Sequence, residues 1–146
     1  MEKAGFLGRF VAWLLDGFFM GILALFTALI LGGLAGLTAS TESSFLSFIS
    51  AGLFALLVIV LLLFQFIYFG YFWSKNGKSL GMRLLSMKVV RQNAGEELSF
   101  VRAGLRGTLG YWLSGLIFSL GYLWALVDQD RETWHDKIFD TWVVKG

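Results

Sequence analysis

The feature that most constrains this chain is a charge-free apolar run over residues 17–37 that directly follows two ionised residues. Its 21 residues would form a helix of roughly 31 Å, the thickness of the hydrocarbon core of a bilayer. Arg9 and Asp16 precede the run, and their spacing of seven residues places them on nearly the same helix face. Because ionised side chains in a membrane segment need a partner or a polar cavity, we expect a spanning helix over residues 10–37 whose charges face protein.

Composition agrees with a membrane environment. The chain is 57% apolar and 15% charged, whereas soluble domains have about 45–50% apolar and about 25% charged residues. It has no cysteine and one histidine, which excludes disulfides and a histidine-rich metal site within one chain. Nucleophile-elbow, phosphate-loop and zinc-protease motifs are absent from the sequence. We expect one domain over residues 1–146, no enzymatic activity, no cofactor and no metal.

Two further apolar segments are expected, over residues 51–74 and 107–127. The last segment is open to two interpretations, because Ser114-Gly115 and Ser119-Leu120-Gly121 can each form a bend. It either crosses the bilayer once or re-enters and returns to the same side.

Charge distribution indicates the orientation. Seven of the twelve basic residues lie in the loop 75–106, whereas the first loop, 38–44, has none. By the positive-inside rule, the N-terminus and the loop 75–106 are expected in the cytoplasm. Arg102 and Arg106 lie four residues apart on one helix face and are expected to meet lipid headgroups. Headgroups account for the basic residues, so no nucleic-acid partner is expected.

Short β-strand patterns occur on both sides of the third apolar segment. Residues 85–91 alternate and are followed by a turn at 92–95, and Thr141–Lys145 resembles Met87–Arg91. Ser99 is placed to cap a helix from Phe100. The expected fold is therefore an all-α integral membrane protein with three hydrophobic helical segments, the third crossing or re-entrant, and a small cytoplasmic β-hairpin-like element.

The charged tail, residues 128–146, completes a pattern that runs through the chain. In chain order the pattern contains Arg9, Asp16, Gly77-Lys-Ser-Leu-Gly81, Lys88-Val-Val90, Asp128, Arg131, Thr133, His135-Asp136 and Thr141-x-Val-Val144. In this order and spacing, over Arg9 to Lys145, the chain resembles the RDD family of small bacterial membrane proteins. Met82 departs from the Lys or Gln that is commoner there, and nothing in the sequence explains the change.

The resemblance implies site residues. The family is named for one arginine and two aspartates, and Arg9 and Asp16 match the first two. The second aspartate is carried onto Asp136, with Asp128 as the alternative. A transport role is suggested for the family, with alkali-cation/proton antiport proposed for some members, while other members look like accessory proteins.

Two functions are therefore expected for this multi-pass protein of the bacterial cytoplasmic membrane. In the first, an oligomer joined through small residues of the first helix exchanges a monovalent cation for protons, and Asp16 carries the ion. Arg9, His135 and Asp136 would then tune its charge state, within a charge cluster that also contains Asp128 and Arg131. In the alternative, Arg9, Asp16 and Asp136 form a structural clasp in an accessory or assembly subunit of a larger membrane complex. Each residue also has a simpler interpretation, as a headgroup anchor for Arg9, a hydrogen-bonding partner for His135 and a solvated carboxylate for Asp128.

Overall fold

The computed structural model describes residues 1–39 and 43–146, and they form two compact units. The first unit combines residues 1–17 with residues 65–146, and the second contains residues 18–64. Residues 40–42 of the first loop lie outside the described residues.

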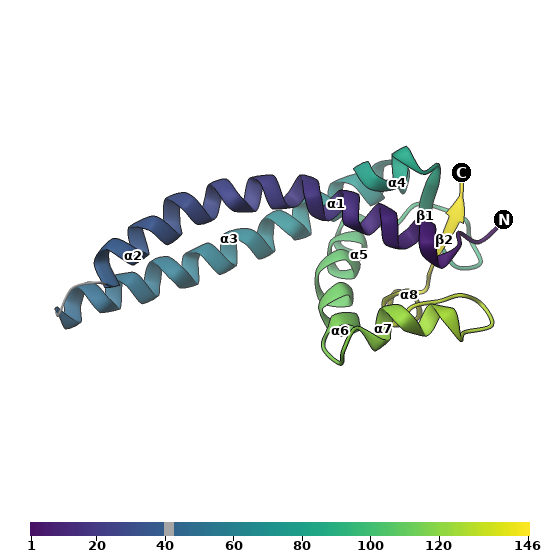
Figure 1. Cartoon of the computed structure of the whole chain (residues 1–146). Coiled ribbons are helices and arrows are strands. Elements are labelled where there is room, and N and C mark those ends of the chain that lie inside the picture. Colours follow the sequence, from purple (N-terminus) through teal and green to yellow (C-terminus); the bar gives the residue numbers. More distant parts are fainter. Residues whose placement is uncertain (40–42) are drawn as a thin grey trace. The chain divides into compact units, whose positions relative to one another are not determined.

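Two long helical stretches confirm the first two expected membrane segments (Figure 1). In the first, α1 (Phe6–Thr27), η1 (Ala28–Gly32) and α2 (Gly33–Ala39) follow one another without a break. The second is α3 (Ser44–Asn76). Phe6–Thr38 and Ser44–Asn76 are each long and apolar enough to cross a membrane. The chain is therefore an integral membrane protein.

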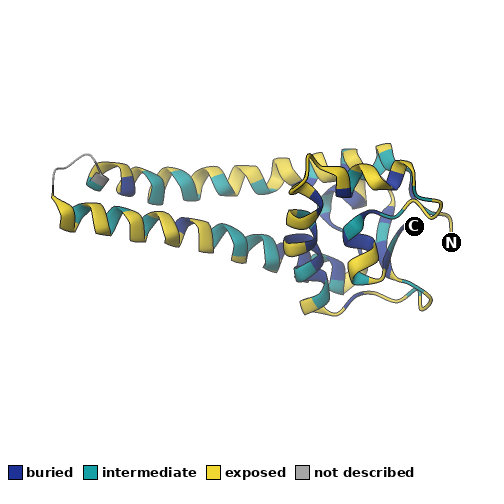
Figure 2. Ribbon diagram, turned by 90° about the horizontal axis from the view of Figure 1, so that it is seen from below, coloured by how far each residue is buried: buried dark blue, intermediate teal, exposed yellow. Residues whose placement is uncertain are grey.

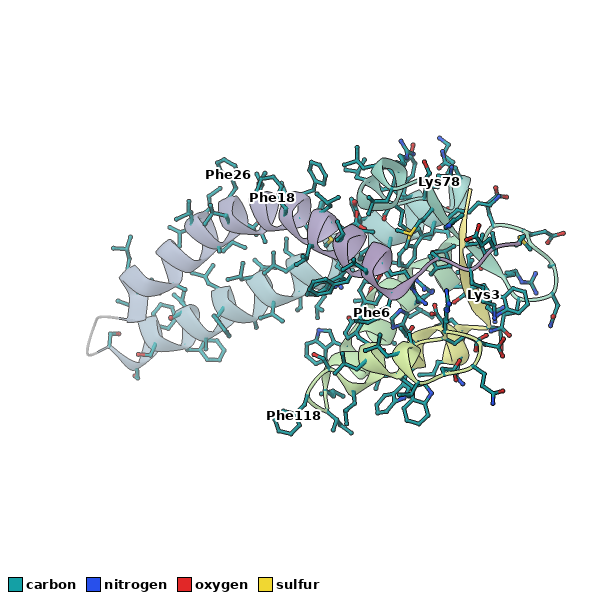
Figure 3. All side chains as sticks on the ribbon, turned by 45° about the vertical axis from the view of Figure 1, so that its right-hand side comes forward. Lys3, Phe6, Phe18, Phe26, Lys78 and Phe118 are labelled. Atoms are coloured by element: carbon teal, nitrogen blue, oxygen red, sulfur yellow. The ribbon has the colours of Figure 1, made fainter. Side chains whose placement is uncertain are left out.

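The unit of residues 18–64 is a helical hairpin. The Ser50 hydroxyl donates to the Ala35 carbonyl over 2.8 Å and links α3 to α2. α3 starts seven residues before the expected residue 51, and Ser47 N–H and Oγ both bond the Ser43 carbonyl at this end. Most large side chains of the unit are exposed (Figure 2), and Phe18 and Phe26 point away from the ribbon (Figure 3). Apolar side chains exposed in this way fit hydrocarbon surroundings.

The other unit packs short elements against the ends of α1 and α3. These elements are α4 (Leu80–Leu84), β1 (Met87–Arg91), α5 (Phe100–Leu105), η2 (Arg106–Gly110), α6 (Tyr111–Gly115), α7 (Leu120–Leu123), η3 (Trp124–Leu126), α8 (Trp134–Phe139) and β2 (Thr141–Lys145). As expected, a helix starts at Phe100 with Ser99 at its N-cap position, although the Ser99 side chain makes no capping hydrogen bond.

β1 and β2 form an antiparallel two-stranded sheet, as the sequence predicts. Val89 lies opposite Val143 and Arg91 opposite Thr141. The N-terminal residues extend the sheet, because Ala4 N–H donates to the Val143 carbonyl over 2.8 Å and Lys145 N–H donates to the Glu2 carbonyl over 2.9 Å. The valines of both strands are buried and form the centre of this unit.

The third apolar segment is sharply bent. Phe100–Gly115 and Leu120–Leu126 meet at 104°, and Phe118 and Ser119 adopt the left-handed conformation in the break, with φ of 46° and 59°. The bend reaches Ser119, the first residue of the second position that the sequence indicated. Because β2 after the bend pairs with β1 before it, the tail returns to the basic loop. This pairing favours the re-entrant alternative over a single crossing.

Glycines allow the bent segment to pack closely on α3. A Cβ atom at Gly107 would lie 2.4 Å from Phe69, and one at Gly104 would lie 2.7 Å from Phe66. The Gln65 side-chain amide donates to the Gly107 carbonyl over 2.7 Å. Gln65, the strongly polar residue of the second membrane segment, therefore has a hydrogen-bond partner.

Candidate functional site: a buried arginine–aspartate clasp

One carboxylate, that of Asp136, joins three parts of the chain. Arg9 Nη2 on α1 bonds Asp136 Oδ2, and Arg106 Nη2 on η2 bonds Asp136 Oδ1. Asp136 and Arg106 are completely buried, and the Arg9 side chain is 11% exposed. We call Arg9, Arg106 and Asp136 the clasp. It holds the tail helix α8 to both the first helix and the bent segment.

The turn before α8 positions the Asp136 carboxylate. Thr133 is the N-cap residue, and its N–H and hydroxyl donate to Asp136 Oδ2 over 3.1 and 2.8 Å. Asp136 N–H in turn donates to Thr133 Oγ1, which completes a capping box. The carboxylate therefore reaches the arginines in a fixed orientation.

Each arginine has further contacts. Arg106 Nε donates to Thr141 Oγ1 over 2.9 Å, and its guanidinium lies 4.6 Å from the centre of the Trp73 ring. Arg106 Nη1 has no hydrogen-bond partner among the described residues. Arg9 Nη1 donates to the Arg131 carbonyl over 2.7 Å.

The two arginines set the charge state of Asp136. Burial alone would raise the pKa of this carboxyl, but the guanidinium groups of Arg9 and Arg106 outweigh burial and hold the pKa well below its usual 3.8. Asp136 is therefore ionised at neutral pH. The clasp carries two positive charges and one negative charge.

His135 lies beside the clasp as a neutral, fully enclosed side chain. Burial lowers its pKa well below the usual 6.5 against the opposite effect of Asp136, and Arg106 and Arg9 lower it further. Its Nδ1 lies 2.9 Å from Ser114 Oγ, and the rings of Tyr111 and Tyr122 pack edge-on against the imidazole. The hydrogen bond of His135 thus goes to Ser114, whereas its Nε2 lies 3.9 Å from Asp136 Oδ1.

Asp16 lies in a separate polar site without a basic partner among the described residues. Its carboxylate accepts from the hydroxyls of Tyr68 over 2.8 Å and Ser79 over 2.5 Å. It also accepts from Gly81 N–H over 2.8 Å. Ser79 is the N-cap residue of α4, so Asp16 receives the N-terminal donors of that helix.

Gly81 allows α4 to approach α1 this closely. A Cβ atom at Gly81 would lie 2.2 Å from the Ala12 carbonyl oxygen. The Gly-Lys-Ser-Leu-Gly sequence thus supplies a hydroxyl and an amide to Asp16 and the room for them to reach it.

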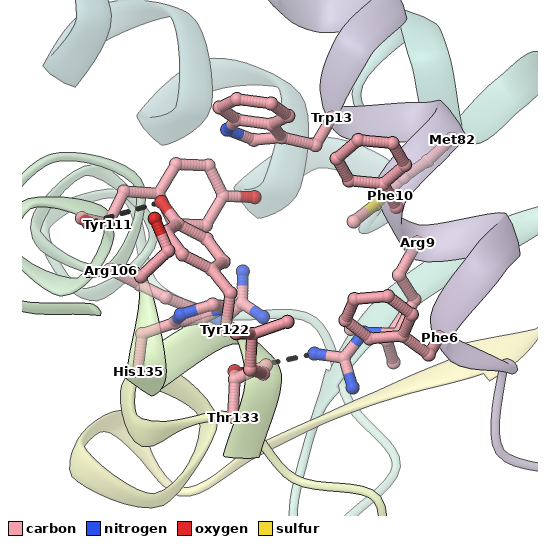
Figure 4. A pocket seen from close by; sticks show the side chains of 13 residues that line it. Phe6, Arg9, Phe10, Trp13, Met82, Arg106, Tyr111, Tyr122, Thr133 and His135 are labelled. Atoms are coloured by element: carbon pink, nitrogen blue, oxygen red, sulfur yellow. Dashed lines mark hydrogen bonds between the residues drawn. The ribbon is translucent and has the colours of Figure 1, made fainter. Parts of the chain in front are cut away.

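A pocket of about 170 Å³ opens beside the clasp (Figure 4). Its polar wall contains Arg9, Arg106, Thr133 and His135. The remaining wall is mostly aromatic and aliphatic, with Phe6, Phe10, Trp13, Met82, Tyr111, Ser119, Tyr122, Leu123 and Val143. Arg9 and Arg106 reach the pocket from opposite sides.

The structure brings together only part of the predicted charge cluster. Asp128 pairs with Lys137 and accepts from Glu132 N–H over 3.0 Å, away from the two arginines of the clasp. The part of Arg131 that meets the clasp is its backbone carbonyl. Between the two aspartates that the family resemblance allowed, Asp136 is the one that meets Arg9.

One predicted role needs correction. Arg106 was expected beside Arg102 on a helix face open to surface lipid headgroups, but it is fully buried and bonds Asp136 and Thr141. Arg102 donates to the Phe139 carbonyl over 2.8 Å and to Asp140 over 2.6 Å. Both arginines therefore face α8 and β2, with Arg106 in the interior and Arg102, whose side chain is 30% exposed, at the edge.

Tyr68 and Trp73 were not predicted as residues of the two sites. Ser79, Thr133 and Thr141 were part of the family pattern, but they were assigned no role at a site. A signal existed for Thr133, because Thr followed three residues later by an acidic residue is a capping pattern. Among the described residues, no group of three or more His, Cys, Asp or Glu side chains could hold a metal ion.

Mycobacterial proteins share sequence with half of this chain. Two relatives from Mycobacterium tuberculosis (strains CDC 1551 / Oshkosh and ATCC 25618 / H37Rv), both named proline-rich antigen homolog, are 33% identical over 73 residues, 50% of this chain and 30% of theirs. The proline-rich antigen of Mycobacterium leprae (strain TN) is 30% identical over 73 residues, 50% of this chain and 29% of its own. The match thus spans under a third of these relatives' length. No solved structure gives a significant match.

The family profile covers far more of the chain. The profile described as the RDD family matches residues 3–140. This range contains all the residues of the clasp and of the Asp16 site. The chain belongs to the RDD family.

Proposed function

We propose that this protein is a non-catalytic accessory or assembly subunit of a larger complex in the bacterial cytoplasmic membrane, with its N-terminus in the cytoplasm. The mycobacterial relatives support the bacterial setting, and the basic loop 75–106 supports the orientation. The observation that carries the proposal is that both oxygens of Asp136 are bound by arginines of the same chain. A carboxylate held in this way is suited to fixing the fold rather than to exchanging ions.

The exposed surface supports the same role. In the helical hairpin of residues 18–64, large apolar side chains such as Phe18, Phe26 and Phe54 are 60–65% exposed. Lipid or another membrane protein can cover such a surface. The clasp would meanwhile hold α1, η2 and α8 together.

Co-purification tests the accessory role. We expect Asp136→Asn to lower both the membrane yield and the recovery of the partner complex after gentle detergent extraction and affinity capture. Asp130→Asn is the matched control, because Asp130 is a 70% exposed tail carboxylate outside the clasp. Purified wild-type protein in liposomes should show no cation or proton flux. Partner recovery that is the same for both variants would argue against the proposal.

A second candidate is exchange of a monovalent cation for protons by an oligomer. The observation that favours it is Asp16, a buried carboxylate whose bonds come from two hydroxyls and one amide rather than from a basic group. Such a group can release a proton or accept a cation without breaking an ion pair. Two spans and a re-entrant segment enclose little space, so this role needs several copies of the chain.

Flux in proteoliposomes distinguishes the two candidates. Under the transport role, a sodium or potassium gradient should drive proton movement in wild type and in Asp130→Asn but not in Asp16→Asn. Absence of flux in correctly folded wild type would remove the transport role and leave the accessory role standing.

A further inference from the structure

The pocket beside the clasp carries an excess of positive charge. Among the described residues, the ion pairs of Arg9 and Arg106 both go to Asp136. Two guanidinium groups therefore share one carboxylate. His135 on the same wall adds no negative charge, because it is neutral. The polar wall of the pocket thus has one positive charge without a counter-charge.

One donor of this wall is also unused. Arg106 Nη1 has no hydrogen-bond partner among the described residues, although the side chain is completely buried. Arg106 Nε and Nη2 are already bound by Thr141 and Asp136. Buried polar groups without a partner are uncommon, and a bound polar ligand is one way to satisfy them. An anionic oxygen in the pocket would supply the missing acceptor after a small shift of the side chain.

The opposite wall of the pocket is apolar and reaches the surface. Phe10 and Trp13 on α1 are 43% and 41% exposed, and their rings stack 5.9 Å apart. Leu123 on α7 is 43% exposed. These side chains belong to membrane segments, so the outer edge of the pocket lies where hydrocarbon is available. A ligand that fits both walls has an anionic end and an apolar end.

We propose that this pocket binds the phosphate-bearing headgroup of an anionic lipid. Arg9 and Arg106 would bind the phosphate, Thr133 would contribute its hydroxyl oxygen, and the acyl chains would lie along Phe10, Trp13 and Leu123. The volume of about 170 Å³ exceeds the roughly 30 Å³ of one water molecule several-fold and has room for a phosphate with a short substituent. Arginine is well suited to phosphate because its planar donors match the oxygens.

The test is retention of lipid by the purified protein. Protein is reconstituted in vesicles of equal phosphatidylglycerol and phosphatidylcholine, extracted in mild detergent and analysed by native mass spectrometry. We expect one phosphatidylglycerol per chain, retained at least about tenfold over phosphatidylcholine, because charge-assisted hydrogen bonds to the phosphate favour the anionic lipid.

Two variants with matched controls locate the binding. Leu123→Trp fills the pocket, and Leu126→Trp makes the same change one turn away, outside the pocket. Arg9→Gln removes the excess charge, and Arg102→Gln removes an arginine outside the pocket. We expect near-equal retention of both lipids in Leu123→Trp and Arg9→Gln, and wild-type preference in the two controls. If Arg9→Gln fails to fold, Leu123→Trp decides, because it leaves every hydrogen bond of the clasp in place.

Soluble probes identify the source of the phosphate. If the site takes a lipid headgroup, millimolar inorganic phosphate or glycerol phosphate should neither displace phosphatidylglycerol nor raise the thermal unfolding temperature. Displacement and stabilisation by inorganic phosphate, abolished by Leu123→Trp, would assign the same site to free phosphate. Equal retention of both lipids by wild type, or preference unchanged in both pocket variants, would overturn the proposal.

Discussion

Arg9 and Asp136 are 127 positions apart, yet their side chains form a buried ion pair. The pair joins the first helix to the last one, and Arg106 binds the other oxygen of the same carboxylate. Of the three residues that the family resemblance singles out, Arg9 and Asp136 are in contact, while Asp16 has its own set of hydrogen-bond donors.

Neutralising Asp136 should strongly destabilise the protein. Asp136→Asn leaves two buried guanidinium groups without a counter-charge, and breaking a buried pair in this way costs about 3–5 kcal/mol. We expect a large fall in the thermal unfolding temperature in detergent. Asp130→Asn should change it little, because the bond to Lys3 lies at the surface. Similar unfolding temperatures for the two variants would contradict the prediction that the clasp stabilises the protein.

Removing the Ser79 hydroxyl should weaken the Asp16 site. Ser79→Ala removes the 2.5 Å bond to Asp16 and the N-cap acceptor for Met82 N–H. Loss of one hydrogen-bond donor to a buried group costs about 1–3 kcal/mol of folding free energy. Thermal unfolding measures the loss, with Ser74→Ala as the control because that hydroxyl is exposed and bonds the nearby Tyr71 carbonyl. Equal effects of the two changes would show that Asp16 does not depend on Ser79.

The close approach of α4 to α1 should be sensitive to one methyl group. Gly81→Ala places a Cβ atom 2.2 Å from the Ala12 carbonyl oxygen. Because this oxygen belongs to the backbone of α1, the clash can be relieved only by shifting one helix relative to the other. We expect destabilisation of about 1–3 kcal/mol or more, measured by thermal unfolding or protease resistance. Gly5→Ala is the control, because a Cβ atom there would meet nothing within 4 Å. A Gly81→Ala protein that is as stable as this control would contradict the close packing of α4 against α1.

Stability should fall in two steps as the pH is lowered. The pKa of His135 is well below 6.5 in the folded state, so the unfolded chain binds a proton first as the pH falls below 6.5. Folding free energy is then lost at up to about 1.4 kcal/mol per pH unit until the folded pKa is reached. The depressed pKa of Asp136 adds a second loss that starts near pH 3.8.

Unfolding measured between pH 8 and pH 3 separates the two groups. Because the sequence contains one histidine, His135→Gln should flatten the slope just below pH 6.5 while the steeper loss below pH 3.8 persists. A wild-type curve that is flat from pH 6.5 to pH 5 would show that His135 is not buried as a neutral group.

The topology predicts which residues face the same side of the membrane. The sequence has no cysteine, so single cysteines can be placed at Ser43, Arg91 and Lys145. Because β1 pairs with β2, Arg91→Cys and Lys145→Cys should react with an impermeant reagent from the same side. Ser43→Cys, which precedes α3, should react from the other side. Opposite labelling of Arg91→Cys and Lys145→Cys would mean that the third segment crosses the bilayer.

The sequence predicted the elements better than the contacts. Hydropathy located both spanning helices, and the alternation in Met87–Arg91 and Thr141–Lys145 located the strands, because these signals are local. The bend at Phe118 and Ser119 left the third segment open to two interpretations, since neither residue requires a left-handed conformation. The structure was needed to choose between them.

The interior position of Arg106 could not be read from the sequence. Four-residue spacing places Arg102 and Arg106 on one helix face, but it does not show that α8 and β2 cover this face and bury Arg106. The partners of Asp16 were missed for another reason. Tyr68, Ser79 and Gly81 lie 52 to 65 positions away in the sequence, so no periodic pattern connects them to Asp16.

The N-terminal residues and the last strand share one set of backbone hydrogen bonds, and Figure 1 shows both chain ends at this sheet. Neighbouring strands lie about 5 Å apart, so polypeptide added at either end would emerge from almost the same point. A unit with adjoining ends can be carried within a larger protein as an insert, with no linker needed to travel around it.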